Sequence, residues 1–585
     1  MAAHRKLDLA GCPKIFRVKS YWWLVLLALL PTWATPPSSA QKIDAETDIV
    51  AAARKLYDAK RWVELVQLTN NQTAQSPELY FLRGMALVRL ERYAEAREVF
   101  SAGYRVAPND MRFLVERAGA EYRLKDFAAA KSDLRRALRA RPKDEYALEF
   151  LGTIYLLEGN PDAALKYWNR VGRPRLASVT LQPEPGLIPK LRKNTVTFNA
   201  PQVLNREAWL ATDARLENLG IFPERRLELA PAGDEDYAAI LHLTERDGRD
   251  NLRWTGLLPL LSGVPYQTVF PDWYNIGGRA INFSSMARWD AQKRRVFASV
   301  SLPVEGRADR AASFFVDARD ENWNLSQTFS GSSFPVSNLN LRSVETGLDL
   351  RFVINGDWSW NAGTGVVGRT FRNAGTETSA AAAAFFTSGT TLKSWIGATH
   401  TLLRVPERRF TISGTANSQF GRGFNDELGP FGSVNGSLKT EWLPHASGDQ
   451  DRLFVQLRGA SIFGTVPLDQ VFELGLDRDS PLWLRGHKAT IDGKKGAAPL
   501  GRRFVLINSE YDRTLYNGGF LRLQVGPLLD MGRISDSSGV IGDPRWLIDT
   551  GVQAKLRVLG AVSVVLSYGR DLRNGRGAFF ATTSH

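Results

Sequence analysis

Few residues in this chain have the types and spacing that enzyme or metal chemistry requires. A catalytic metal needs three or four ligands at recurring separations. The six histidines show no such spacing, and Cys12 is the only cysteine. No nucleophile elbow, P-loop or HExxH motif occurs either. We therefore expect no enzyme, no catalytic residue, no metal and no cofactor. The histidines are His4, His242, His400, His445, His487 and His585.

One segment imitates a nucleotide-binding motif. Residues Gly363–Gly368 read GTGVVG, which matches the dinucleotide fingerprint GxGxxG. That fingerprint works only between a strand and a helix whose N-terminus receives the pyrophosphate. Here Trp358 and Trp360 precede the glycines and Arg369 and Phe371 follow them, which is typical of a strand. We expect a glycine-rich strand and not a cofactor site.

The most informative polar group surrounds an arginine near the C-terminus. Leu484-Arg485-Gly486-His487 is followed by Glu510 and then by Asp530 and Gly532, in the sequence Leu-Asp-Met-Gly. An arginine in a confined space must be paired, and a carboxylate matches its planar guanidinium. We predict that Arg485 pairs with Asp530, with Glu510 as the second candidate. The alternative is that Arg485-Gly486 forms an ordinary turn.

The elements that must position these residues are short alternating strands. Residues 453–457, 521–525 and 552–558 each alternate apolar with polar or charged side chains. A soluble sandwich also alternates in this way, so the number of segments decides. Many such segments occupy residues 258–585, with Trp and Tyr near their ends and no candidate membrane helix. This predicts a C-terminal antiparallel transmembrane β-barrel of about 16 strands.

The N-terminal half contains an α-helical repeat with a period of 34 residues. Small residues would let the two helices of a unit approach closely, while large ones would fill the gap between units. The pattern resembles the tetratricopeptide repeat and predicts a solenoid over residues 44–173, with a divergent unit near 52–68. Its groove would receive an extended peptide or a partner helix. The signature residues are Gly84, Ala96, Phe100, Pro108, Ala118, Ala130, Leu134, Pro142, Gly152, Ala164 and Trp168.

A small α+β unit is predicted between the repeats and the barrel, at residues 190–248. Its elements would be a strand at Thr195–Phe198, a helix at Val203–Leu219 closed by Gly220, and strands at Arg226–Leu229 and Tyr237–Leu243. Ile221-Phe222 would begin the second of these strands. The unit resembles a POTRA (polypeptide-transport-associated) domain, which makes the chain a multidomain protein.

The N-terminus predicts export from the cytoplasm. Five basic residues precede the apolar stretch Tyr21–Leu30, and Ser38-Ser39-Ala40 follows it. The apolar stretch is shorter than the roughly 20 residues of a membrane anchor, which favours a secretory signal peptide at residues 1–40. Its removal lowers the net charge from +14 to about +10 and leaves no cysteine. The remaining charge favours anionic partners, and the compartment points to outer-membrane lipid and not to nucleic acid.

The Arg-Gly segment and the later D-x-G motif together resemble the barrel of the outer-membrane assembly and two-partner-secretion superfamily, the bacterial surface antigen type. The resemblance spans Thr195–Phe580. It implies that a long loop folds into the barrel and that its tip arginine meets the acid of the D-x-G motif. This chain departs from the pattern at His487, where the family prefers an aromatic residue, and in its Thr-Thr-Ser-His ending.

The resemblance implies an outer-membrane barrel that inserts or translocates polypeptides, with the N-terminal domains in the periplasm. The repeats would recruit a periplasmic protein or unfolded polypeptide clients, which would add as a strand to Arg226–Leu229 or Tyr237–Leu243. One alternative is a repeat-and-barrel exporter of exopolysaccharide, a class that lacks the α+β unit and the Arg-Gly loop. Another is a surface receptor or scaffold that transports nothing.

Overall fold

The computed structural model forms two compact units, residues 1–124 and 125–585. It describes residues 39–585 apart from 71–75, 234–235, 247–262, 326–335, 337, 375–383, 425–427, 449, 519, 537–540, 542, 559–561 and 585. The predicted signal peptide lies almost wholly outside the described residues, because the first helix begins at Ser39. None of the described helices is both long and apolar enough to cross a membrane.

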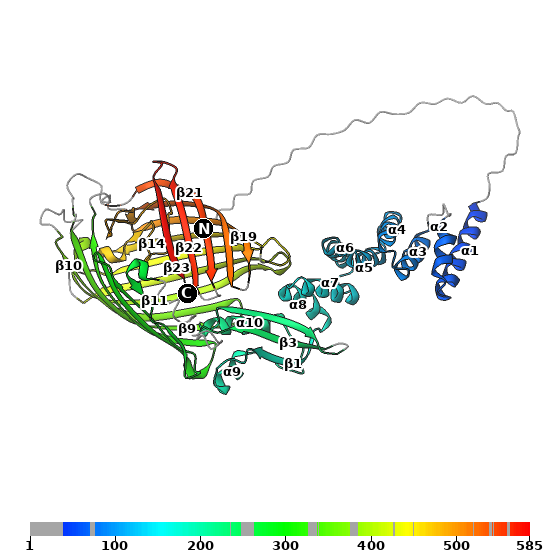
Figure 1. Ribbon diagram of the computed structural model, residues 1–585, viewed down its shortest axis with the longest axis horizontal. Helices are drawn as coiled ribbons and strands as arrows, with labels where there is room; N and C mark the ends of the chain where they lie inside the picture. The colour runs from blue at the N-terminus through cyan, green and yellow to red at the C-terminus, as the bar shows by residue number, and fades with distance from the viewer. Residues whose placement is uncertain are drawn as a thin grey trace, which may run out of the picture. The chain divides into compact units, whose positions relative to one another are not determined.

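The predicted helical repeats are present as consecutive helix pairs (Figure 1). The first unit contains α1 (Ser39–Asp58), α2 (Trp62–Asn70), α3 (Pro77–Arg89), α4 (Tyr93–Val106) and α5 (Arg112–Arg123). The second unit begins with α6 (Phe127–Ala140), α7 (Glu145–Leu157), α8 (Pro161–Trp168) and the short helix η1 (Asn169–Val171). Pro108 and Pro142 lie in the turns between helices, and the other signature residues are buried in them.

The repeat signature works through contacts between a glycine and a large side chain. A Cβ on Gly84 would lie 2.3 Å from the ring of Phe100, and one on Gly152 would lie 2.3 Å from the indole of Trp168. Each pair joins the two helices of one unit. In these contacts the ring takes the place that a side chain on the glycine would occupy. Trp168 also packs against Tyr237, outside its own repeat, with 5.1 Å between the ring centroids.

The α+β unit is longer than predicted. It consists of β1 (Arg175–Gln182), α9 (Pro189–Thr195), α10 (Arg206–Asn218), β2 (Glu224–Pro231) and β3 (Asp236–Thr244). Its sheet has the order β1-β3-β2, with β1 parallel and β2 antiparallel to β3.

Two boundaries of this unit were predicted wrongly. The strand expected at Thr195–Phe198 is absent, because Thr195 ends α9 and its hydroxyl donates to the Leu191 carbonyl. The first strand is β1, which lies before residue 190. Gly220 does close α10 in the left-handed conformation, at φ 71°. Ile221 and Phe222 are buried, but they precede β2 and do not begin it.

The C-terminal region is a closed barrel whose ring contains 18 strands among the described residues. Four of them, β4 (Thr268–Val269), β5 (Trp273–Ile276), β16 (Thr490–Ile491) and β17 (Lys494–Lys495), have only two to four residues. The count exceeds the predicted value of about 16 because it includes these short segments. Two of them, β16 and β17, belong to the loop that connects β14 and β19, and those two strands also pair with each other directly. The longer strands are β6 (Ile281–Trp289), β7 (Lys293–Pro303), β8 (Arg310–Trp323), β9 (Leu339–Val353), β10 (Trp358–Arg372), β11 (Gly389–Val405), β12 (Phe410–Gly423), β13 (Phe431–Trp442), β14 (Asp451–Gly464), β19 (Arg503–Asn517), β20 (Leu521–Ser535), β21 (Asp543–Val558), β22 (Val562–Asp571) and β23 (Gly577–Ser584).

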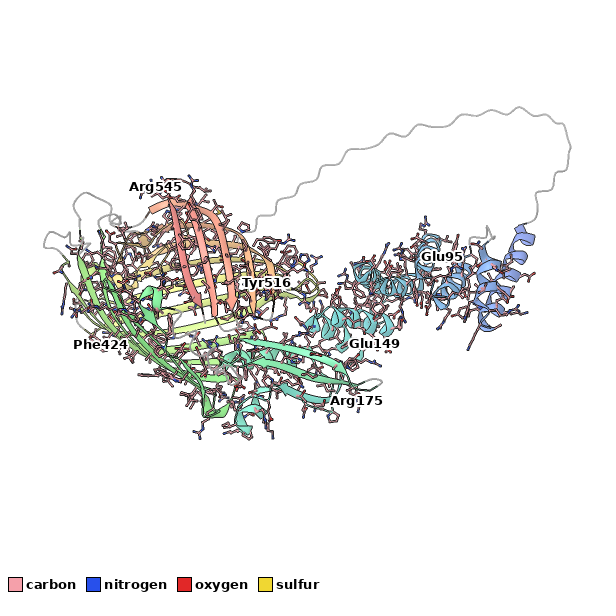
Figure 2. All side chains as sticks on the ribbon, in the orientation of Figure 1. Glu95, Glu149, Arg175, Phe424, Tyr516 and Arg545 are labelled. Atoms are coloured by element: carbon pink, nitrogen blue, oxygen red, sulfur yellow. The ribbon has the colours of Figure 1, made fainter. Side chains whose placement is uncertain are left out.

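The alternating pattern places apolar side chains outside the barrel and polar ones inside. Val552 is 57% exposed, whereas the next residue, Gln553, is buried and donates to Asp512 across the inner wall. Exposed aromatic side chains occur at opposite ends of the wall, at Phe424 and Tyr516 (Figure 2). The Gly363–Gly368 segment lies within β10, which continues to Arg372, so no helix begins at these glycines and the dinucleotide alternative fails.

One end of the barrel contacts the α+β unit and helix α8. The Asn218 side chain of α10 donates to the Ala308 carbonyl in the β7–β8 turn, and Asn282 of β6 donates to the Leu219 carbonyl. Lys166 of α8 pairs with Glu407 in the β11–β12 turn. We call this the turn end, and the opposite end the loop end.

Candidate functional site in the barrel lumen

The candidate site is built by an inner loop, residues 465–502, which connects β14 to β19 from the loop end. These two strands pair directly with each other, so the intervening loop leaves the wall of the barrel. Its apolar side chains Leu474 and Leu484 are fully buried, with Phe504 and Ile534 of the wall in the same cluster. Asp492 and Gly493 both have positive φ, as a tight hairpin turn between β16 and β17 requires.

Arg485 at the tip of the inner loop contacts both predicted carboxylates. Its Nε and Nη2 donate to the two oxygens of Asp530 at 2.8 and 2.6 Å, and its Nη1 donates to Glu510 at 2.7 Å. The Arg485 backbone N–H also donates to Asp530. Arg485 and Asp530 are at most 1% exposed. A bidentate contact of this kind, shielded from water, is among the strongest that a guanidinium makes.

A network of wall residues supports this pair. Gln553 accepts from Arg485 and donates to Asp512, while Lys555 donates to Glu510 and Asp512. These contacts join β19, β20 and β21 beneath the loop tip. Gly532 leaves room for Leu484, because a Cβ there would lie 3.1 Å from the leucine Cδ atoms.

The next two residues of the tip contact a second pair of acids. The Gly486 N–H donates to Asp549 at 2.6 Å, and a Cβ at Gly486 would lie 2.5 Å from the Asp571 nitrogen. The His487 Nδ1 lies 3.1 Å from Asp549, and its Nε2 lies 3.4 Å from Asp571. The imidazole therefore bridges two acids that are almost fully buried.

His487, Asp549 and Asp571 are also the group that, among the described residues, could hold a metal ion. The chain offers no spacing signal for this group, since its members come from three separate elements. Both imidazole nitrogens already face a carboxylate oxygen, at 3.1 Å and 3.4 Å, so the ring lies between two acids. The geometry thus favours a structural contact for His487 over metal ligation.

We expect His487→Leu to lower the free energy of unfolding by about 1–3 kcal/mol, because two buried acids lose a hydrogen-bond partner. Denaturant unfolding of the purified barrel in detergent measures this. The matched control is His242→Leu, which removes an exposed histidine paired with Glu228 on the α+β sheet and should change stability by less than about 0.5 kcal/mol. Equal effects of the two changes would contradict a bridging role for His487.

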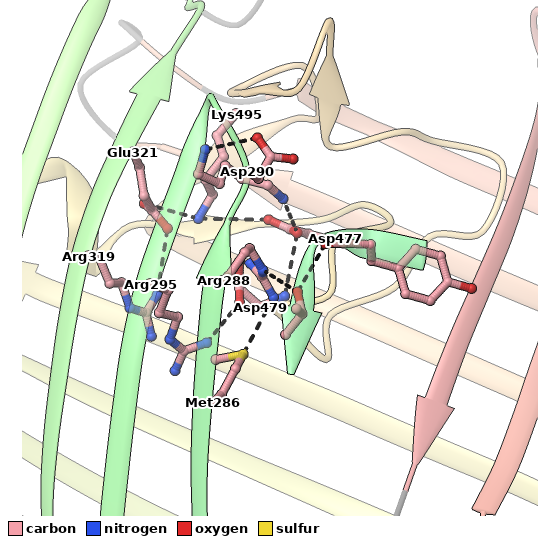
Figure 3. Close-up of polar contacts among 12 residues, drawn as sticks. Met286, Arg288, Asp290, Arg295, Arg319, Glu321, Asp477, Asp479 and Lys495 are labelled. Atoms are coloured by element: carbon pink, nitrogen blue, oxygen red, sulfur yellow. Dashed lines mark hydrogen bonds and ion pairs between the residues drawn. The ribbon is translucent and has the colours of Figure 1, made fainter. Parts of the chain in front are cut away.

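A second anchor fixes the opposite side of the inner loop to strands β6 and β7 (Figure 3). Asp479 accepts from Arg288 at 2.6 Å and from Arg295 at 2.7 Å, and Asp477 accepts from Lys293 at 2.9 Å. Burial by itself raises the pKa of Asp479. The attraction of Arg288 and the neighbouring cations outweighs this effect and holds the pKa well below its usual value. Both acids are therefore charged under all physiological conditions.

The second anchor also includes a buried lysine surrounded by acids. Lys495 of β17 lies 3.5 Å from Glu321 and 3.8 Å from Asp477. The nearby Glu473 accepts from the Gly496 N–H, and burial raises its pKa to about 8. Glu473 is thus largely protonated at neutral pH, which limits the repulsion among the acids around Lys495.

The second anchor was missed in the sequence. Its signals are present, since Asp477-Arg478-Asp479 is a charged triplet within a loop, and Lys293 and Arg295 are two residues apart on one strand. Neither pattern shows which strands of the barrel wall the inner loop contacts. The acids Asp549 and Asp571 were also missed, although Asp549-Thr550-Gly551 repeats the D-x-G spacing of Asp530.

Fold and site together define a class of protein: a closed β-barrel with an inner loop anchored to two walls, preceded by a small α+β unit and helical repeats. The protein-family model described as tetratricopeptide repeat matches residues 81–130 and 115–174. No curated protein sequence matches the chain.

Several solved barrels are similar to this chain. BamA from Haemophilus ducreyi lacking POTRA domains 1–3 is 12% identical over 70% of this chain and 85% of that one, with a TM-score of 0.40. CdiB from Escherichia coli is 15% identical over 71% and 77%, with a TM-score of 0.44. CdiB from Acinetobacter baumannii is 15% identical over 79% and 87%, with a TM-score of 0.43.

Proposed function

We propose that this protein is an outer-membrane β-barrel that inserts or translocates polypeptides. The observation that carries the proposal is the inner loop, which contacts β6 and β7 through Asp477 and Asp479 and β19 to β21 through Arg485. A loop anchored on both sides closes the lumen at rest and can open it when the ion pairs separate. A scaffold that transports nothing has no need of such a device.

The outer surface supports a membrane location. Apolar side chains such as Val296, Phe314 and Val552 are exposed on the outside of the strands, as a hydrocarbon environment requires. Transmembrane barrels have short periplasmic turns and longer external loops. The turn end, which contacts the α+β unit and α8, would therefore face the periplasm.

The α+β unit offers an edge at which a client can add as a strand. The sequence offered two candidate edge strands, Arg226–Leu229 and Tyr237–Leu243. Because β3 is the central strand of the sheet, Tyr237–Leu243 cannot be an edge. The start of β1 is occupied, because the Leu176 N–H donates to the Gln202 carbonyl. The outer edge of β2, which includes Arg226–Leu229, is the proposed capture site, and the repeats would bring clients or a partner protein to it.

A proline scan of Arg225–Leu229 tests this capture site. Successive N–H groups of an edge strand point alternately to its partner and to solvent, and proline removes the donor. We expect tolerance to alternate along β2. At the solvent-facing positions the barrel should insert and stay heat-modifiable while polypeptide clients accumulate in the periplasm.

Alanine at the same positions is the matched control, because it keeps the N–H and should leave the clients unaffected. The proposal would be wrong if an assembled variant lacking residues 175–244 had outer-membrane and secreted proteomes identical to wild type. Loss of surface glycan with a normal protein profile would favour the exopolysaccharide exporter instead.

A further inference from the structure

A row of charged side chains lies on the outside of the barrel near the loop end. Cross-strand pairing places Arg294 of β7 opposite Asp320 of β8, and Asp320 opposite Arg342 of β9. The residues beside Arg294 in the chain, Lys293 and Arg295, face the lumen and bind the inner loop. Because side chains alternate along a strand, Arg294 must point outwards.

The aromatic residue Trp289 extends this row on one side. It pairs with Arg294 across β6 and β7, and it is exposed. On the other side Thr370 of β10 pairs with Arg342. An aromatic ring beside cations on the outer wall is typical of the level at which lipid headgroups meet the hydrocarbon layer.

The next row of outward-facing residues, towards the middle of the barrel, is apolar, and its side chains alternate between larger and smaller ones. Val296, Ala318, Val344 and Gly368 pair in sequence across four strands. The two valines are 59% and 53% exposed, while alanine and glycine alternate with them. These small residues leave a groove of about 1150 Å³ that runs beneath the arginines. An acyl chain has the width and the apolar surface to occupy such a groove.

The two arginines of the row differ in how much of their charge is available to an anion. Asp320 accepts from Asn340 at 2.7 Å and lies 3.0 Å from Arg342, so Arg342 already shares its charge with this acid. In the described part of the chain, no carboxylate contacts the Arg294 guanidinium. Other exposed arginines occur at outward positions near the same end, which makes the row part of a basic belt. They are Arg422, Arg503 and Arg533.

The opposite end differs in chemistry. Outward-facing positions there include Trp358, Trp360 and Leu515, all exposed. Arg513 of β19 is also exposed at an outward position there, so the loop end is distinguished by the neighbouring Arg294 and Arg342 and not by basic residues in general.

We propose that Arg294 and Arg342, together with the valine-lined groove below them, bind a diphosphorylated glycolipid of the outer leaflet. The two arginines are separated by one strand and hence by about 10 Å, which suits two phosphates on one headgroup better than a single phosphodiester. One acyl chain would lie along Val296 and Val344. The inference rests on the proposed outer-membrane location, but not on the identity of any client.

Native mass spectrometry of the full chain in detergent, titrated with diphosphorylated lipid A, tests this site. We expect Arg294→Gln/Arg342→Gln to weaken binding about 30-fold, as the loss of two cations at an anionic lipid surface should. Arg408→Gln is the matched control, because this exposed arginine lies in a turn at the opposite end and should bind as wild type does.

Three results would overturn the proposal: unchanged binding by the double variant, equal binding of phosphatidylglycerol, or displacement of the lipid by millimolar inorganic phosphate. The variant Ala318→Leu tests the groove itself, because it should weaken lipid binding without altering any charge.

The lipid-binding assay is separate from client transport, so normal lipid binding with an unchanged proteome would contradict only the transport function. Absence of lipid binding with client accumulation in β2 variants would contradict only this site.

Discussion

Arg485→Ala is expected to lower the free energy of unfolding by about 3–5 kcal/mol, because it leaves Asp530 and Glu510 charged and buried without their shared partner. The loss should appear as a lower denaturant midpoint in detergent and as a barrel that is no longer heat-modifiable at the wild-type temperature. Asp530→Ala should have a similar effect, since it strands the guanidinium instead.

The double variant Arg485→Ala/Asp530→Ala distinguishes a direct pair from two independent sites. Because each single change already breaks the same contacts, the double variant should be little worse than either one. Additive effects would contradict the pairing. Lys488→Ala is the control, since this exposed cation lies on the same loop and should change stability by about 0.5 kcal/mol or less.

The second large effect is expected at the other anchor. Asp477→Asn/Asp479→Asn leaves Arg288, Lys293 and Arg295 facing one another with fewer acids between them. Removing one side of a buried ion network costs about 3–5 kcal/mol. The inner loop should then detach from β6 and β7 while the Arg485 tip stays bound.

Conductance in planar bilayers measures this detachment. The variant should show larger or more frequent openings than wild type, because one side of the inner loop is no longer held against the wall. Asp492→Asn is the matched control: it removes an exposed acid from the same loop, and asparagine accepts the left-handed conformation found there. Wild-type conductance in the double variant, with normal assembly, would show that the second anchor does not close the lumen.

The repeats and the barrel strands could be predicted from the sequence because their signals are local and periodic. The 34-residue spacing of Gly84, Ala118 and Gly152 reports contacts between neighbouring helices, which depend on residues close in the chain. Likewise, the alternation around Val552 reports the two faces of one strand. The strands of the short α+β unit were harder to predict. β1 pairs with β3 about 60 residues later, and it has no local signal that separates it from a linker.

The candidate site shows the same division. The need of Arg485 for a carboxylate follows from the chemistry of guanidinium, and the D-x-G motif indicated which acid could supply it. His487 could not be matched to Asp549 and Asp571 in this way, because the three residues meet only where β21 and β22 pass the loop tip.

Local composition therefore determines which segments are helices and strands, which residues face a lumen, and which cation needs an anion. The tertiary structure alone decides that Asp477 and Asp479 lie against β6 and β7, more than 180 residues away, and that Arg294 and Arg342 lie on one outer row. The physical reason is register: closing the barrel sets which residues of neighbouring strands lie side by side, and no single strand carries that information.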